Sequence, residues 1–220
     1  MMTSRDTAPR TGPIGPDSQG RHDINMPIAH LPKALALALV LASAGLAAQA
    51  PSADAASVAR HAASCRGADG NPLTTATRSV RRATLCLLNA ERRGRGLGRL
   101  RSNSRLARAA ARHARDMVRN DYFSHDSLDG RDFVDRILNT NYVKATDPGW
   151  VLGENLAWGS GRTATPRQIV RGWMASPGHR RNILGRRYRE VGIAVVRGVP
   201  QPGARRGATY ATEFGRRRRR

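Results

Sequence analysis

A continuous apolar run near the amino terminus divides this chain of 220 residues into a leader and one domain. The run covers residues 34–48, follows a short basic segment that begins at Met26, and precedes the triplet Ala53-Asp54-Ala55. It is shorter than the roughly 20 residues that a membrane-spanning helix needs. We therefore predict a signal peptide over residues 26–55, cut near Ala55. A cut after Ala50 and an uncleaved N-terminal anchor are the alternatives.

Three other segments lack the periodicity of folded elements. Residues 1–25 are polar and rich in Gly, Pro and Asp, which predicts disorder or an over-extended start of the chain. Residues 56–77 lack clear periodicity, so we predict a linker there. We also predict that the basic tail, residues 216–220, is disordered. The folded domain is therefore expected over residues 78–215.

Within that domain, helical patterns come first and strands then alternate with helices. A stripe of apolar residues from Leu106 to Met117 has helical spacing, and Asn103 or Ser104 can begin that helix. Alternation around Val191–Val195 predicts a strand. The expected helices cover residues 78–93, 104–119, 132–138, 166–175 and 177–183, and the expected strands cover 151–157, 191–195 and 207–214. This order predicts an α+β domain, a small sheet covered by helices.

The chain is strongly basic, with a net charge of +22 from 38 basic and 16 acidic residues. The leader contains four of each, so its removal leaves this charge unchanged. An anionic partner such as a wall polymer or acidic lipid is one interpretation, and a solvated basic surface is the other. We do not expect nucleic acid to be the partner of an exported protein.

The two cysteines, Cys65 and Cys86, are too far apart in sequence for a CxxC redox pair or a metal knuckle. In an oxidising compartment they predict one disulfide, with two free buried thiols as the alternative.

Three polar residues at the ends of expected elements are candidates for a site. His125 follows a helix, Glu154 enters an apolar stretch, and His179 begins a helical turn. Two imidazoles and a carboxylate can hold Zn²⁺, or can hold one another through charged hydrogen bonds. His113 lies on an apolar helix face, so we predict that it is a core residue. His61 lies in the predicted linker, and we expect it to be inert.

Several segments in a fixed order resemble the bacterial branch of the CAP superfamily (cysteine-rich secretory, antigen 5, pathogenesis-related 1), also called SCP-like or YkwD-like proteins. The most specific are the Gly-Glu-Asn-Leu of residues 153–156 and the Ser-Pro-Gly-His-Arg-Arg-Asn-Ile-Leu of residues 176–184. The other matching residues are 86–92, 96–97, 110–117, 123–125, 157, 173–175 (Trp173-Met-Ala), 188–192 and 210–215.

The resemblance implies a three-layer α-β-α sandwich with a small central antiparallel sheet. It also implies a cleft with two His and two acidic residues, where the His pair can bind a divalent metal, often zinc. His125, Glu154 and His179 match three of the four cleft residues, and the two histidines are the expected metal ligands. The family's second acid stands three residues after a Trp, where this chain has Ser176. Glu190 is a substitute acid or a plain surface residue.

The residues leave three functions open for a secreted or envelope-associated protein that we expect to be a monomer. The first is an extracellular domain that binds a lipid, glycan, wall fragment or protein in this cleft. The second is a hydrolase in which a metal held by the histidines and Glu154 as base activate water. The third is a structural or defence-related factor. Fold alone does not choose among them.

Overall fold

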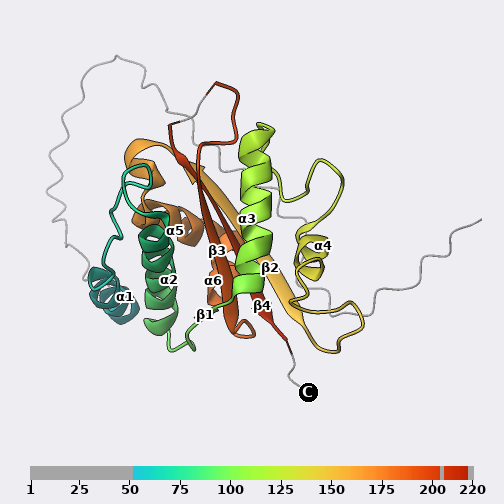
Figure 1. Ribbon diagram of the computed structural model, residues 1–220. Helices are drawn as coiled ribbons and strands as arrows, with labels where there is room; N and C mark the ends of the chain where they lie inside the picture. The colour runs from blue at the N-terminus through green and yellow to red at the C-terminus, as the bar shows by residue number, and fades with distance from the viewer. Residues whose placement is uncertain (1–51, 204–205, 218–220) are drawn as a thin grey trace, which may run out of the picture.

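The computed structural model describes residues 52–203 and 206–217, and it has three layers (Figure 1). The predicted leader, up to residue 51, and most of the basic tail lie outside the described residues. The elements in chain order are α1 (Ala53–Ala63), α2 (Thr77–Arg93), β1 (Arg101–Ser102), α3 (Ser104–Arg119), α4 (Phe133–Leu138), β2 (Val151–Gly159), η1 (Gly161–Ala164), α5 (Pro166–Ala175), α6 (Pro177–Leu184), β3 (Glu190–Arg197) and β4 (Ala208–Arg216).

The central sheet has the strand order β1-β3-β4-β2, so β1 and β2 form its two edges. β4 pairs antiparallel with both β2 and β3, as expected for the antiparallel sheet. The short β1 pairs parallel with β3 and was not predicted. Two residues are too few to show an alternating pattern, so only the chain's return beside β3 reveals this strand.

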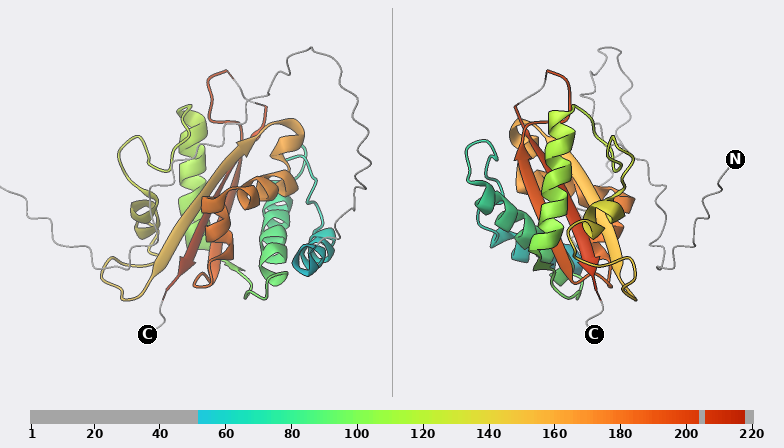
Figure 2. Two further views of the ribbon diagram at one scale, coloured as in Figure 1. Left: turned by 180° about the vertical axis from the view of Figure 1, so that it is seen from behind. Right: turned by 45° about the vertical axis from the view of Figure 1, so that its right-hand side comes forward.

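Each face of the sheet has its own core, because side chains alternate along a strand. On one face, Val191, Ile193 and Val195 of β3 pack with residues of α2, α5 and α6. On the other face, Ala194 and Ala211 pack against the Ala110–Met117 part of α3. Figure 2 shows both layers, with α5 and α6 on the side away from α3.

Small residues allow α3 to lie close to the sheet. A Cβ on Gly192 would collide with the backbone of Leu106 and Ala107, so this position of β3 admits only glycine at the present spacing. The helix begins as predicted at Asn103, whose Oδ1 accepts from the Arg105 and Leu106 amides. The Gly192 contact therefore fixes the height of α3 above the strands.

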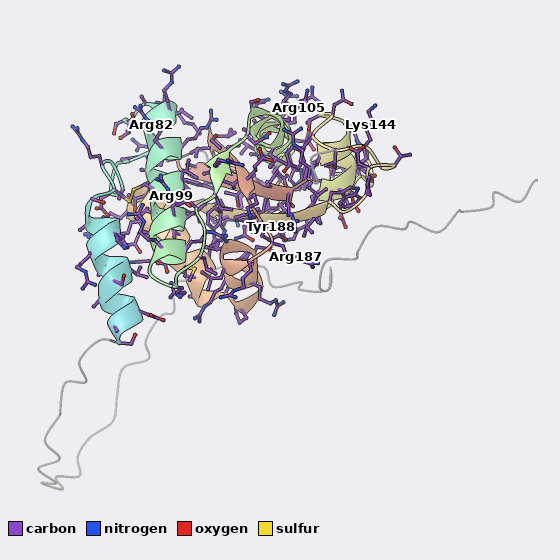
Figure 3. The ribbon with its side chains drawn as sticks, turned by 90° about the horizontal axis from the view of Figure 1, so that it is seen from below. Arg82, Arg99, Arg105, Lys144, Arg187 and Tyr188 are labelled. Atoms are coloured by element: carbon purple, nitrogen blue, oxygen red, sulfur yellow. A yellow bond between two sulfur atoms is a disulfide. The ribbon has the colours of Figure 1, made fainter. Side chains whose placement is uncertain are left out.

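Most of α1 lies in the segment predicted as a linker, and its first three residues, 53–55, lie at the end of the predicted leader; the helix was missed because none of its residues is buried. Cys65 follows this helix and forms the predicted disulfide with Cys86 of α2, drawn in yellow in Figure 3. The disulfide ties α1 to the domain. In the part of the chain that the structure describes, no helix combines the length and apolar character needed to cross a membrane.

Candidate functional site

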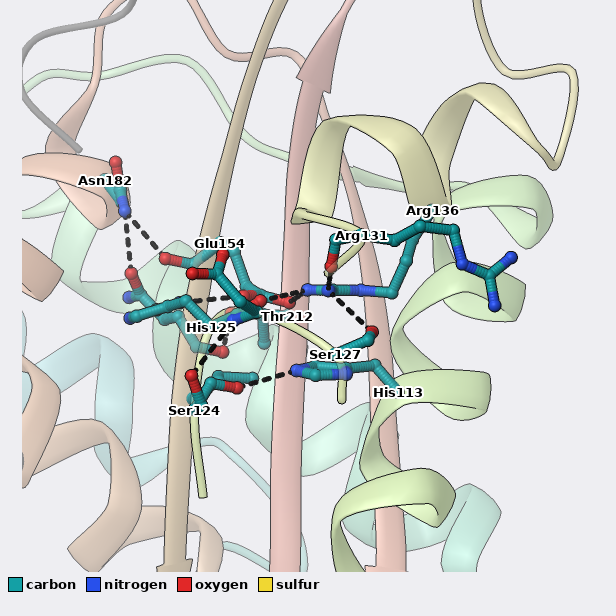
Figure 4. Close-up of polar contacts among 12 residues, drawn as sticks. His113, Ser124, His125, Ser127, Arg131, Arg136, Glu154, Asn182 and Thr212 are labelled. Carbon is teal, nitrogen blue, oxygen red and sulfur yellow. Dashed lines mark hydrogen bonds and ion pairs between the residues drawn. The ribbon is translucent and has the colours of Figure 1, made fainter. Parts of the chain in front are cut away.

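The carboxylate of Glu154 lies at the centre of the candidate site. Glu154 is in β2, and its side chain is only 1 % exposed. His125 Nδ1 is 2.7 Å from Oε1, and the Arg136 guanidinium donates to Oε2 at 2.8 Å (Figure 4). Because an ionised carboxylate only accepts hydrogen bonds, Nδ1 of His125 carries the proton. Both carboxylate oxygens are therefore paired.

Arg136 of α4 holds the loop that carries His125. Its guanidinium donates to the His125 carbonyl at 2.8 Å, to the Arg131 carbonyl at 2.9 Å and to Ser127 Oγ at 3.1 Å. The side chain is buried, so its charge is balanced at short range by Glu154. Sequence reasoning missed Arg136, because one arginine in so arginine-rich a chain carries no signal before the chain folds.

His113 of α3 supports the same loop from the helix layer. It is 1 % exposed, and its Nε2 lies 2.9 Å from the Ser124 carbonyl, which accepts the ring proton. Burial lowers the pKa of His113, so the ring is neutral. This confirms the prediction of a core histidine, whose hydrogen bond fixes the residue before His125.

His125 keeps one ring nitrogen for other partners. Its side chain is 47 % exposed, and with Nδ1 bound to Glu154, only Nε2 is free. Burial lowers the pKa of His125, but the hydrogen bond and negative charge of Glu154 outweigh it, so the pKa is raised overall. The same contacts with His125 and Arg136 overcome burial at Glu154 and hold the pKa of its carboxyl well below its usual range. The site thus presents an oriented imidazole whose protonated form is favoured.

His179 approaches from the opposite side of β2, in the first turn of α6. Asn155 donates to its carbonyl at 3.1 Å, which docks the helix on the strand. The ring is partly buried, and its Nδ1 has no hydrogen-bond partner among the described residues. Burial and then the charge of His125 lower the pKa of His179 to about 4. The structure therefore places His125, Glu154 and His179 around one strand.

Three side chains from the segments that carry the family resemblance close the outer edge of β2. Tyr188 donates to the Leu152 carbonyl at 3.1 Å, Asn182 to the Glu154 carbonyl at 2.9 Å and Trp173 to the Leu156 carbonyl at 2.9 Å. Unpaired edge carbonyls would otherwise be buried at a cost. These contacts join the Gly-Glu-Asn-Leu segment to the segments around Trp173, Asn182 and Tyr188 in the folded chain.

A second buried acid, Glu213, lies beside Glu154. The two residues are opposite each other in the pairing of β2 with β4, and Glu213 is 0 % exposed. Neither of its carboxyl oxygens has a hydrogen-bond donor within the described residues. Burial and the negative charge of Glu154 raise the pKa of Glu213 well above its usual range. We conclude that Glu154 is ionised and Glu213 is protonated.

Glu213 is the acid that sequence reasoning missed. Its signal was a carboxylate within the strand Tyr-Ala-Thr-Glu-Phe-Gly of residues 210–215, where the neighbouring side chains are apolar or small. Glu190, proposed as a substitute acid, is elsewhere: it accepts from Asn103 at 2.9 Å and from Tyr142 at 2.8 Å. Glu190 therefore does not act as the second acid beside Glu154, because Asn103 and Tyr142 already bind its two oxygens at the start of β3. Glu213 instead faces Glu154.

Ser176 occupies the junction of α5 and α6. Its side chain makes no capping hydrogen bond, although the residue stands at the N-cap of α6 as predicted. The same holds for Thr165 before α5, whose hydroxyl donates to the Arg162 carbonyl instead. Proline at the first helical position starts both helices without that cap. Ser176 therefore lies at the junction of the two helices, and its side chain forms no hydrogen bond with Glu154 or Glu213.

The expected zinc site does not fit this donor set. Both oxygens of Glu154 and Nδ1 of His125 are already paired, and the cationic Arg136 lies against the same carboxylate. Within residues 52–203 and 206–217, no three or more His, Cys, Asp or Glu side chains form a group able to hold a metal. Of the expected ligands, only the two imidazoles retain free nitrogens, fewer than the three protein ligands of a catalytic zinc.

Comparisons with known proteins agree with this fold. A family model described as the cysteine-rich secretory protein family, CAP, matches residues 85–203. The uncharacterized protein YkwD of Bacillus subtilis (strain 168) is 33 % identical over 129 residues, which cover 57 % of this chain and 47 % of that protein. The uncharacterized membrane protein YlbC of the same organism is 35 % identical over 113 residues, covering 51 % and 30 %. This chain thus spans less than half the length of either relative.

Two solved structures are also similar to this chain. An outer surface protein from Borrelia burgdorferi superimposes with a TM-score of 0.54 at 19 % identity, covering 66 % of this chain and 97 % of that one. An extracellular protein containing an SCP domain from Bacillus anthracis str. Ames has a TM-score of 0.49 at 24 % identity, covering 65 % and 44 %. At this identity, the first likeness shows a shared fold alone.

Proposed function

This chain belongs to the cysteine-rich secretory protein (CAP) family, and we propose that it acts outside the cell as a binding domain. The ligand lies against His125 and His179. One observation carries the proposal: a buried ion pair, Glu154 with Arg136, is used to orient a half-exposed imidazole. Burying two charges is costly unless they are well paired, so a site that orients a side chain in this way is suited to recognition.

The two imidazoles define the chemistry of the ligand. His125 favours its protonated form and offers a donor to an anionic oxygen. His179, with its pKa lowered to about 4, is neutral and can accept a hydrogen bond. A ligand with a carboxylate beside hydroxyl or amide groups satisfies both. Fragments of the cell wall have all three groups, so we assign the ligand to this class.

Calorimetry with muramyl dipeptide as the probe tests the proposal. His125→Gln and His179→Gln are each expected to weaken binding about tenfold, the effect of losing one hydrogen bond of roughly 1.4 kcal/mol. His61→Gln is the matched control, because His61 lies on α1 and its ring is hydrogen-bonded only to Arg93 among the described residues. If all three variants bind the probe as tightly as the wild-type protein, His125 and His179 do not form the binding site.

Export through the predicted leader is part of the proposal, and the start of α1 bears on the cleavage position. Ser52 is the N-cap of α1, and its Oγ accepts from the Ala55 amide at 3.3 Å. A cut after Ala55 would remove this cap and the first helical turn, whereas a cut after Ala50 keeps both. We therefore favour the cut after Ala50. N-terminal sequencing of the exported protein decides between them.

The hydrolase alternative is supported through His125 rather than Glu154. A carboxylate that orients Nδ1 leaves Nε2 as a base, an arrangement used in acyl-transfer enzymes. Glu154 is unsuited to act on water itself, because its oxygens are buried and paired. If the protein hydrolyses muramyl dipeptide, His125→Gln should abolish turnover. Measurable turnover in that variant would eliminate His125 as the base.

A further inference from the structure

A basic groove lies at the β1 edge of the sheet, opposite the β2 edge that carries Glu154. It runs between β1 and α2, has a volume of about 640 Å³, and three of its lining residues are Arg99, Arg101 and Arg189. None of the residues that line it is acidic. Since β1 and β2 are opposite edges, this groove is separate from the site around Glu154.

The floor of the groove is rigid. Asn89 of α2 is buried, and its side-chain amide exchanges two hydrogen bonds with the Leu100 backbone, at 3.1 and 2.8 Å. The buried Arg92 donates to the Gly98 carbonyl at 2.7 Å and fixes the preceding loop. The backbone that positions Arg99 and Arg101 is thus held in place before any ligand arrives, which lowers the entropic cost of binding.

The groove arginines are not neutralised by the protein. Arg99 and Arg101 are exposed and form no hydrogen bond or ion pair through their side chains within residues 52–203 and 206–217. Arg189 is steadied by the carbonyls of Arg186 and Tyr188. Glu190, next to Arg101 across the β1–β3 pair, is already bound by three other side chains: it accepts hydrogen bonds from Asn103 and Tyr142, and Arg217 lies within 3.7 Å as an ion pair. Three guanidinium groups therefore keep their full charge.

The positive charge continues along α2 beyond the groove. Arg78 and Arg82 are exposed and lie, by helical spacing, on the same face of α2 as Leu85 and Asn89, which line the groove. Figure 3 shows Arg82 on α2 and Arg99 beside that helix. An extended row of this kind fits a linear ligand with repeated negative charges rather than a single anion.

We propose that this groove binds a linear phosphodiester polymer of the cell envelope, with phosphates paired to Arg99, Arg101 and Arg189. The planar guanidinium group matches phosphate oxygens in a bidentate manner. A lipid surface is disfavoured, since the one large exposed hydrophobic residue of the described chain, Leu128, lies in the loop between α3 and α4. Single-stranded nucleic acid is disfavoured because no aromatic side chain lines the groove for base stacking.

A charge-matched pair of variants tests this proposal against the general basicity of the protein. The groove variant is Arg99→Gln with Arg101→Gln, and the control is Arg112→Gln with Arg115→Gln on the exposed face of α3. The probe is a synthetic glycerol phosphate oligomer, with affinity measured at several salt concentrations. The groove variant should lose about tenfold in affinity, and its slope of log affinity against log salt should fall by about 2. The control should change less than about twofold.

Two outcomes overturn the proposal. Equal losses in the groove variant and the control would show that overall charge, rather than the groove, binds the polymer. Tighter binding of phosphatidylglycerol vesicles or of a thymidine oligonucleotide, lost in the groove variant, would show that the groove serves a different polyanion. Adding Arg189→Gln to the groove variant should weaken binding of the oligomer further.

Discussion

Glu154 and Glu213 face each other across β2 and β4, both buried, and among the described residues donors reach the oxygens of only one of them. His125 and Arg136 stabilise the ionised form of Glu154, and that charge together with burial keeps Glu213 protonated. Two neighbouring carboxyl groups whose environments drive their pKa values apart are a recurrent feature of functional sites. Of the two, Glu154 contacts His125 directly, through Nδ1.

Replacing Glu213 with Gln should stabilise the protein increasingly as pH rises. The pKa of Glu213 in the folded protein is raised. The contribution of the protonated carboxyl to the stability of the wild-type protein is therefore complete below the ordinary pKa of 4.5 and is lost as pH rises towards the folded-state pKa. Gln cannot ionise, and its amide can donate to Glu154. Urea denaturation should show a gain of about 1–3 kcal/mol at pH 8 relative to pH 4.

Glu91→Gln is the control for that experiment, since Glu91 forms an i,i+4 ion pair with Arg95 on α2. The Glu91 variant should change stability by less than about 1 kcal/mol across the same range. A Glu213→Gln effect that is identical at pH 4 and pH 8 would contradict the protonated state assigned to Glu213.

Arg136→Met should be strongly destabilising. Removal of the guanidinium leaves the buried Glu154 carboxylate with His125 alone, and the His125 loop loses three hydrogen bonds. Breaking one partner of a buried pair costs about 3–5 kcal/mol. Arg131→Met is the control, because its ion pair with Asp129 is more than half exposed. Similar thermal stability of the two variants would refute the structural role of Arg136.

His179 should titrate far below His125 in an NMR experiment that follows the ring resonances. The pKa of His179 is about 4 and that of His125 lies above 6.5. Neutral His179 therefore contributes stability above pH 6.5, and this is lost as pH falls through about 4. In His125→Gln the pKa of His179 should rise but stay below 6.5, because burial is the larger cause. Titration of both rings near 6.5 would contradict the burial of His179 and the pairing of His125 with Glu154.

Gly192→Ala should destabilise the domain by about 1–3 kcal/mol, the usual cost of overpacking. The added methyl group meets the backbone of Leu106 and Ala107, which α3 can relieve only by moving away from the sheet. Gly172→Ala in α5 is the matched control, because no neighbouring element of the described chain comes within 4 Å of a Cβ at that position. That variant should gain about 0.5–1 kcal/mol in helix propensity. Equal melting temperatures would disprove the close approach of α3.

Local patterns in the chain were enough to predict the long helices, the long strands and the disulfide, and to single out His125, Glu154 and His179 as candidate site residues. Helical and alternating periodicities are local, and the ordered segments at residues 153–156 and 176–184 point to the family that the comparisons show. What those residues contact depends on the folded chain. Arg136 and Glu213 join Glu154 only because α4 and β4 return beside β2, and β1 exists only as a partner of β3. Long-range pairing has no local pattern, so the burial and partners that set the charges of Glu154 and Glu213 arise only when distant segments pack together.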